Sequence, residues 1–175
     1  DDTQCAGCHT PEGELPFAAS IVGAHTNPTN WKGAPGLKLT ISGVTGAAPG
    51  KQPTVTFQIT DNAGNGIPAS ALATTPNRLA LVMAGPTSDY GYTSFGSDVT
   101  TPGYVSENPI SKAVCGGGGV CTYTFTHAIP ANAKGTFAIG IEGRRGIVIN
   151  AGTNAQVSSE DGAKKHVVHF SVDGA

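Results

Sequence analysis

Cys5, Cys8 and His9 form the sequence Cys-Ala-Gly-Cys-His, whose residue types and spacing indicate a specific chemistry. Covalent haem attachment needs two thiols that reach the two vinyl groups of one porphyrin, and an imidazole directly after the second thiol binds the iron. A redox-active cysteine pair is expected beside a βαβ unit, a zinc site needs four ligands, and a plain disulfide leaves His9 unexplained. We therefore predict one covalent c-type haem at this motif.

The second axial ligand of the iron is predicted to be His25, at the end of a short helix expected over residues 15–24. That helix can fold back over the porphyrin. A water, an open site or a neighbouring chain's histidine remain as alternatives. The other candidate side chains are expected in the core, at strand ends or on strand faces: Met83, His127, His166 and His169. An exposed His169 is a weaker candidate ligand for a haem outside this chain.

The ligand pair decides between electron transfer and catalysis. Two imidazoles keep the iron six-coordinate in both oxidation states, so little rearranges on electron transfer and no site is open for oxygen or peroxide. Ligation by His9 and His25 therefore predicts a low-potential electron carrier that is not an enzyme. An open sixth position predicts ligand binding or peroxidase-like activity instead, and this alternative stays open.

Cys115 and Cys121 form the second cysteine pair, and no histidine follows either of them. Four glycines between them allow a tight reversal of the chain, so the two thiols can meet. We predict a hairpin disulfide, which indicates an oxidising, extracytoplasmic compartment. A reactive thiol pair that senses redox state is the alternative.

The composition limits the partners that the chain can have. Charged residues make up 13% of its 175 residues and the formal net charge is −2, so it lacks the clustered basic surface of a nucleic-acid-binding protein. No apolar run approaches the roughly 18–20 residues that cross a bilayer. We expect no nucleic-acid partner and no transmembrane segment.

From residue 37 onwards the apolar residues alternate with polar ones, which is typical of strands with one buried face. About seven short strands are predicted, at 37–41, 55–59, 79–83, 123–125, 137–141, 147–149 and 168–172. The fold class is therefore all-β, either a Greek-key split β-barrel or an immunoglobulin-like sandwich. We divide the chain into a haem-binding N-terminal arm at 1–36 and an all-β Greek-key domain at 37–175.

Four segments lack this alternation. Residues 88–109 are predicted to be a long loop that covers one open end of the sandwich, or alternatively a functional contact surface. Residues 61–66 have the composition of a turn. Residues 143–146, Gly-Arg-Arg-Gly, are predicted to be a solvated turn, with docking of a carboxylate or a haem propionate by the two arginines as the alternative. Residues 158–161 are predicted to be a polar loop.

Several stretches resemble the OmcA/MtrC family of multihaem outer-surface cytochromes. They are CAGCHTPEGELPFAASIVGAHT, APGKQPTVTFQITDNAGN, NRLALVMAGPTSDYG, YVSE and GAKKHVVHFSVDGA. The resemblance implies alternating haem-packed and haem-free split β-barrel domains, and haem binding by Cys5, Cys8 and His9. It also implies electron transfer to partner cytochromes, extracellular metal oxides or soluble shuttles. Some members carry a disulfide in a β domain, which Cys115 and Cys121 are expected to match.

The chain departs from this family because it has one haem motif where the family has about ten. It is either a segment of a multihaem protein or a monohaem relative that relays electrons through neighbouring copies. The expected function is that of an extracytoplasmic c-type cytochrome at the cell surface, in the extracellular space or in the periplasm. The alternative is a β-sandwich binding module with an accessory or sensing haem.

Overall fold

The computed structural model describes residues 10–174 except 29–30, 75, 90–93 and 97–102. In these residues the chain forms nine strands and very little helix, which confirms the all-β prediction. The strands are β1 (Lys38–Thr45), β2 (Thr54–Thr60), β3 (Arg78–Ala84), β4 (Tyr104–Glu107), β5 (Val114–Cys115), β6 (Val120–Thr124), β7 (Thr136–Ile149), β8 (Val157–Gly162) and β9 (His166–Ser171). The helical segments are α2 (Ile21–His25), η2 (Ala69–Leu72) and η4 (Gly117–Gly119).

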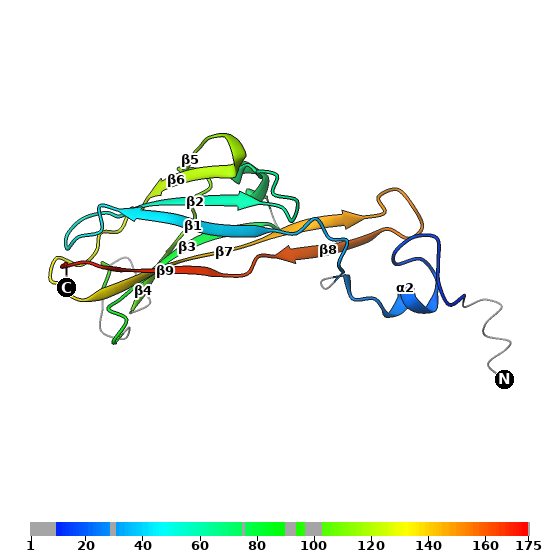
Figure 1. Cartoon of the computed structure of the whole chain (residues 1–175), viewed down its shortest axis with the longest axis horizontal. Coiled ribbons are helices and arrows are strands. Elements are labelled where there is room, and N and C mark those ends of the chain that lie inside the picture. Colours follow the sequence, from blue (N-terminus) through cyan, green and yellow to red (C-terminus); the bar gives the residue numbers. More distant parts are fainter. Residues whose placement is uncertain (1–9, 29–30, 75, 90–93, 97–102, 175) are drawn as a thin grey trace.

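The strands form two antiparallel sheets that pack face to face (Figure 1). One sheet has the order β1-β2-β6-β5, and the other has the order β4-β3-β7 with both β8 and β9 paired to the far side of β7. Within the described residues the two sheets do not close into a barrel, so the arrangement is that of a β-sandwich. At the side where β1 and β9 meet, the amide of Ile41 donates a hydrogen bond to Nδ1 of His166 (3.1 Å).

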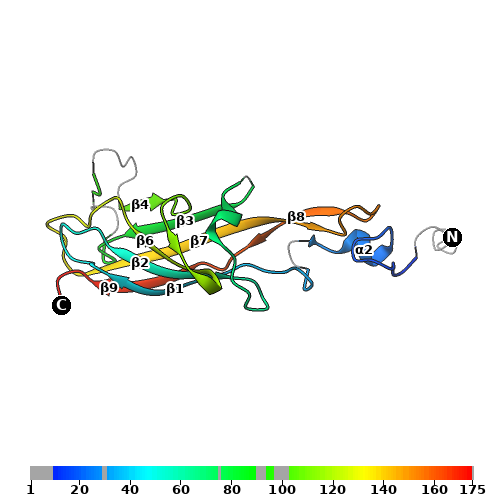
Figure 2. The ribbon, with the colours of Figure 1, turned by 90° about the horizontal axis from the view of Figure 1, so that it is seen from above.

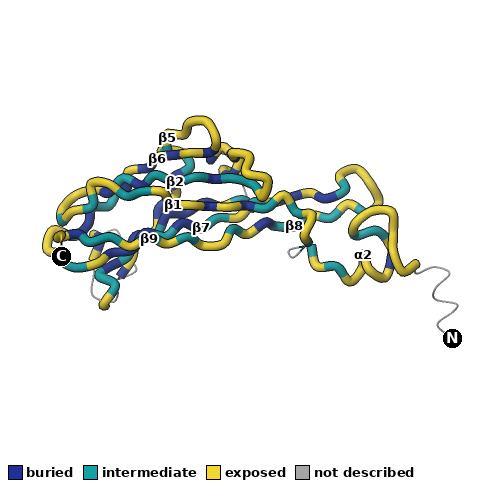
Figure 3. The backbone as a smooth tube through the Cα atoms, viewed as in Figure 1, coloured by how far each residue is buried: buried dark blue, intermediate teal, exposed yellow. Residues whose placement is uncertain are grey.

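The core of the sandwich is built from the alternating apolar residues that the sequence pattern marks. Along β2 the side chains of Val55, Phe57 and Ile59 are fully buried, while Thr56 and Gln58 between them lie on the outer face and are half-buried. Met83 on β3 is also fully buried. This confirms the expectation that Met83 belongs to the core. Figure 3 shows buried positions alternating with exposed ones along the strands.

The buried carboxylate of Glu107 joins the two sheets. It lies at the end of β4 and accepts hydrogen bonds from the hydroxyl of Tyr123 (2.6 Å), from the backbone and hydroxyl of Thr126, and from the backbone amide of His127. The His127 imidazole also contacts this carboxylate. Burial alone raises the pKa of Glu107, but these hydrogen bonds favour the ionised form and bring the pKa below its ordinary value.

Three local predictions are wrong, and all concern the second sheet. Residues 143–146 are not a turn, because β7 continues through them while pairing with β3 on one side and β8 on the other. Gly143 serves close packing, since an added Cβ would lie 3.0 Å from both the Arg78 carbonyl oxygen and the Leu39 side chain. Residues 158–161 belong to β8, and residues 104–107 of the predicted long loop form β4.

Candidate functional site

The first described part of the chain, residues 10–36, forms an arm that lies beyond one end of the sandwich (Figures 1 and 2). Beside it runs the hairpin of residues 144–162, in which the last residues of β7 pair with β8. We call these two segments the arm and the finger. The arm and the finger contact each other through the residues described below.

The arm contains a shorter helix than the sequence predicted. Residues 15–24 do not form one helix, because Phe17 adopts a left-handed backbone conformation (φ 64°) that interrupts it. The helix α2 begins after Ser20, whose hydroxyl accepts a hydrogen bond from the amide of Gly23 (2.9 Å) and so caps the N-terminus. His25 is the last residue of α2.

A charged clamp holds the end of the arm against the finger. The Asp161 carboxylate accepts a hydrogen bond from the amide of Gly36 (2.9 Å), and the Arg145 guanidinium donates to the carbonyl oxygen of the same glycine (2.6 Å). Arg145 and Asp161 also form an ion pair at 3.6 Å, and both side chains are largely buried. Gly36 has φ 77° and an added Cβ would collide with Asn62, so glycine is required there.

One further hydrogen bond attaches the arm to the finger. The Asn150 side-chain amide, at the tip of the finger, donates a hydrogen bond to the carbonyl oxygen of Pro16 in the arm. Ile147 and Ile149 are buried although they are not part of the sandwich core. Figure 3 shows these buried stretches of β7 continuing past the sandwich on the side of the arm. The arm is therefore packed against the protein at several points.

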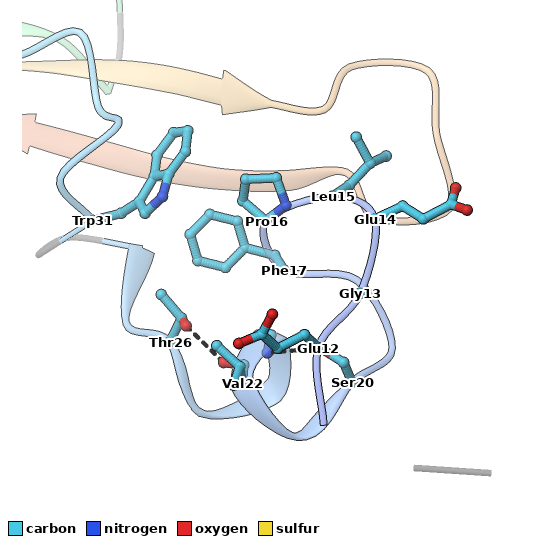
Figure 4. A pocket seen from close by; sticks show the side chains of 11 residues that line it. Glu12, Gly13, Glu14, Leu15, Pro16, Phe17, Ser20, Val22, Thr26 and Trp31 are labelled. Atoms are coloured by element: carbon cyan, nitrogen blue, oxygen red, sulfur yellow. Dashed lines mark hydrogen bonds between the residues drawn. The ribbon is translucent and has the colours of Figure 1, made fainter. Parts of the chain in front are cut away.

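A groove of about 440 Å³ lies within the arm. Its walls include Pro16, Phe17, Val22 and Trp31, with the rings of Phe17 and Trp31 in edge-to-face contact at 5.5 Å (Figure 4). Large apolar side chains gather in this segment without cover, since Leu15, Ile21 and Val22 are 42%, 48% and 55% exposed. The arm thus gathers several exposed apolar side chains, and the groove within it is also lined by Glu12 and Glu14.

Cys5, Cys8 and His9 lie outside the described residues, so the structure does not test their predicted roles. His25 is exposed at the end of α2, and no described residue forms a hydrogen bond with its imidazole. A haem ligand needs such a free ring nitrogen. Among the described residues, His25 is therefore a predicted ligand whose imidazole has no other hydrogen-bond partner. In the part of the chain that the structure covers, no group of three or more metal-ligating side chains occurs.

The imidazoles of the other candidate ligands differ in whether they have a hydrogen-bond partner. His127 contacts Glu107, and Nδ1 of His166 accepts the amide hydrogen of Ile41. His169 is exposed on the outer face of β9, with no hydrogen-bond partner among the described residues. The exposure of His169 agrees with its expected place on the outer face of this strand.

The predicted disulfide between Cys115 and Cys121 is confirmed, with the two sulfur atoms 2.09 Å apart. The cysteines face each other directly across the pairing of β5 and β6, and η4 makes the reversal between them. The bridge ties a two-residue edge strand to the first sheet. It lies far along the chain from the arm and takes no part in the candidate site.

Sequence reasoning missed the residues that position the arm. The sequence predicts a solvated turn at Arg145 and a polar loop at Asp161. Their partners lie far apart in the chain, as in the pairing of Asp161 with Gly36, so no local pattern marks them. The only available signal was the occurrence of two arginines between glycines in an otherwise weakly charged chain.

Comparison with known proteins gives limited information. No protein-family model matches the chain, and no curated protein is similar enough in sequence to count as a relative. A solved structure that matches in part is the crystal structure of MtrC from Shewanella baltica OS185, with 16% sequence identity and a TM-score of 0.47. The match covers 80% of this chain and 24% of that protein. Among the described residues, no helix is both long and apolar enough to cross a membrane.

Proposed function

We propose that the chain is an extracytoplasmic c-type cytochrome, or a segment of a multihaem one, and that it carries single electrons. The observation that carries this proposal is the Cys5-Ala-Gly-Cys8-His9 motif, which combines two thiols and an imidazole at the spacing of covalent haem attachment. A c-type haem supplies reversible one-electron chemistry at its iron. The chain's own residues must hold it, orient it and limit access to it.

Each residue has a separate role in this proposal. Cys5 and Cys8 would hold the porphyrin by thioether bonds, and His9 would supply an imidazole to the iron. His25 binds from the other side through its free imidazole. The apolar groove on the arm covers part of the ring and excludes water, which favours electron transfer over side reactions.

The sandwich acts as a scaffold and docking surface. The clamp between Arg145, Asp161 and Gly36 fixes the end of the arm against the finger, which supports a scaffold role for the sandwich. One haem at one end of an elongated molecule cannot conduct across its length. The proposed partners are therefore other cytochromes or haem domains, including copies of this chain, and extracellular metal oxides or soluble shuttles. The disulfide supports an extracytoplasmic location.

The test is the reduced-minus-oxidised absorption spectrum of the purified chain, together with its reduction potential. We expect c-haem bands and a six-coordinate spectrum that does not change when carbon monoxide is added. Absence of c-haem bands would refute the function. Rapid carbon monoxide binding by the unaltered chain would instead favour an open-site haem enzyme.

The second ligand is tested by His25→Ala, with His169→Ala as the matched control. Both side chains are exposed imidazoles without a described partner, so the two changes should cost little stability. We expect the haem of the His25→Ala variant to bind carbon monoxide, with a change in its absorption spectrum. The His169→Ala variant should keep the spectrum of the parent. An unchanged spectrum and potential in His25→Ala would show that another group completes the iron.

A further inference from the structure

The outer face of the second sheet differs from that of the first. On the first sheet the outward residues of β2 and β6 are mostly threonine, and the hydroxyls of Thr54 and Thr124 contact each other across the strands (2.8 Å). A polar outer face of this kind is usual for an antiparallel sheet. On the second sheet, two neighbouring rows across the strands hold no lysine, arginine or carboxylate. They are Tyr104, Ala84, Ala138 and His169, and Ser106, Val82, Gly140 and Val167.

These rows contain a shallow hollow of about 240 Å³, which we call the trough. Apolar residues from three strands line it: Val82, Ala84, Ala138, Gly140 and Val167. Val167 is 49% exposed, so this apolar surface lies open. The volume is below the roughly 300–1,000 Å³ of small-molecule pockets, so the trough suits a protein side chain better than a whole ligand.

Positive charge borders the trough. Glu142 occupies the next outward position of β7 after Gly140, and its carboxylate pairs with both Arg78 (2.8 Å) and Lys165 (3.6 Å). One carboxylate therefore serves two cations, and both cations are more than half exposed. A surface that covers the trough is favoured if it brings a further carboxylate to this border.

The arm has the complementary features. Ile21, the first residue of α2, is 48% exposed and does not line the groove on the arm. Its amide donates to the carbonyl oxygen of Thr10 (2.9 Å), which places Ile21 beside the chain that leads to Glu12 and Glu14. Neither glutamate forms an ion pair with a described residue. Exposed apolar surface and unpaired negative charge therefore lie close together on the arm (Figure 3).

The arm cannot cover the trough of its own copy. The arm lies beyond one end of the sandwich, and contacts with the finger hold it there through Asn150 and Arg145 (Figures 1 and 2). The trough lies on the sandwich itself, between β3 and β9. A contact between the two surfaces therefore requires a second copy of the chain.

We propose that the arm of one copy docks on the second sheet of another, with Ile21 in the trough and the two arm glutamates facing Arg78 and Lys165. The contact joins two different surfaces, so each copy offers its arm to one neighbour and its trough to another. Such a contact builds an open head-to-tail chain of copies unless the rotation between them closes a ring. The proposal rests on the proposed function for its purpose, because that function names copies of this chain as electron-transfer partners.

Sedimentation equilibrium of the purified full chain measures the association. We expect the weight-average mass to rise past that of a dimer as the concentration increases over about 10 µM to 1 mM, the range of a small and weak interface. Added salt should weaken the association, because the charges at the border of the trough are exposed and become screened.

Three variants place one new carboxylate each. Val167→Glu alters the trough, Ile21→Glu alters the arm, and Val120→Glu is the matched control, since Val120 is a 39% exposed valine on the outer face of the first sheet. All three positions are exposed, and a glutamate suits the first turn of α2, so the fold should tolerate each change. We expect Val167→Glu and Ile21→Glu to raise the Kd of association at least about tenfold, because docking would bury an unpaired charge. Val120→Glu should leave it within about twofold.

Mixing the two weakened variants tests the pairing of unlike surfaces. The Ile21→Glu copy keeps an intact trough, and the Val167→Glu copy keeps an intact arm, so one contact can still form between them. We expect the mixture to give a dimer with one copy of each variant that does not grow further, with a Kd within about twofold of that of the parent.

Several results overturn the proposal. They are a parent that stays monomeric at about 1 mM, an equal loss in Val167→Glu and Val120→Glu, and a mixture that associates no better than either variant alone. A parent that stops at a dimer, with no recovery on mixing, would show a symmetric contact between like surfaces instead. The haem spectrum of the same samples separates this proposal from the proposed function. Normal c-haem bands in a chain that does not associate would refute the docking alone, whereas absent bands in a chain that associates would refute the electron carrier alone.

Discussion

The buried carboxylate of Glu107 gives the sharpest test of how the sandwich is held together. We predict that Glu107→Gln strongly lowers the free energy of unfolding at neutral pH. In Glu107→Gln an NH2 group replaces one carboxylate oxygen. This group is a hydrogen-bond donor, but it faces the backbone N–H groups of Thr126 and His127, which are also donors and so lose an acceptor. The hydroxyl of Tyr123 loses a charged acceptor at 2.6 Å as well.

The size of the effect follows from these contacts. A hydrogen bond to a charged group contributes about 1.5–3 kcal/mol, and a buried donor without an acceptor costs about 1–3 kcal/mol. Because the amide oxygen still accepts some of these bonds, we expect a loss of about 3 kcal/mol in Glu107→Gln. The control is Glu142→Gln, which makes the same chemical change. Glu142 pairs with the exposed side chains of Arg78 and Lys165, so its replacement should cost less than about 1 kcal/mol.

The effect must also depend on pH. The folded pKa of Glu107 lies below its ordinary value of 4.5, because the hydrogen bonds from Thr126, Tyr123 and His127 outweigh the burial that raises it. The unfolded chain therefore binds a proton more readily than the folded chain. The stabilisation is fully present above about pH 4.5 and is lost as pH falls through the folded pKa. The difference between parent and Glu107→Gln should shrink in the same window.

The assay is urea unfolding followed by circular dichroism, carried out from about pH 7 down to about pH 3 on the parent and both variants. A loss in Glu107→Gln no larger than that in Glu142→Gln would refute the argument that the buried network joins the two sheets. A loss that stays constant below pH 4.5 would show that the ionised form of Glu107 is not what the network stabilises.

Two other perturbations test the attachment of the arm and the edge of the first sheet. Arg145→Met leaves Asp161 without its cation. It should speed amide hydrogen exchange at Gly36 about tenfold and change the exchange rates of core amides little. An unchanged exchange rate at Gly36 would show that the clamp does not hold the arm. The double change Cys115→Ala and Cys121→Ala should lower the free energy of unfolding by about 2 kcal/mol, the entropy of closing a short loop. Urea unfolding measures it, and a loss near zero would argue against that contribution.

The strands with regular alternation could be predicted from the sequence because one face of each is buried and the other is solvated. In β2, three fully buried apolar residues alternate with threonines and glutamine, and the period of two is visible without any partner. The same reasoning placed Met83 in the core and His169 on an outer face. Whether these residues are buried or exposed can be predicted from their immediate neighbours in the chain.

The missed elements depend on contacts between distant segments. β8 contains Ser158, Ser159 and Glu160, a polar run without alternation, and it is a strand because it pairs with β7. Gly143 was read as part of a turn, whereas its lack of a side chain serves close packing against Arg78. The clamp likewise joins Gly36 to residues more than 100 positions away. The sequence predicts a haem motif, but no local pattern in it predicts how the arm is held.

The continuity of β7 has a mechanical consequence. Its first half lies inside the sandwich and its second half forms one side of the finger, so a single strand connects the core to the support of the arm. A pulling force applied near residue 10 meets the Asn150 contact and then the Arg145 clamp before it reaches β1. Those contacts yield first, which shields the hydrogen bonds between β1 and β2 from the load. The contacts of the finger thus bear a force applied to the N-terminal side before that force reaches the sandwich.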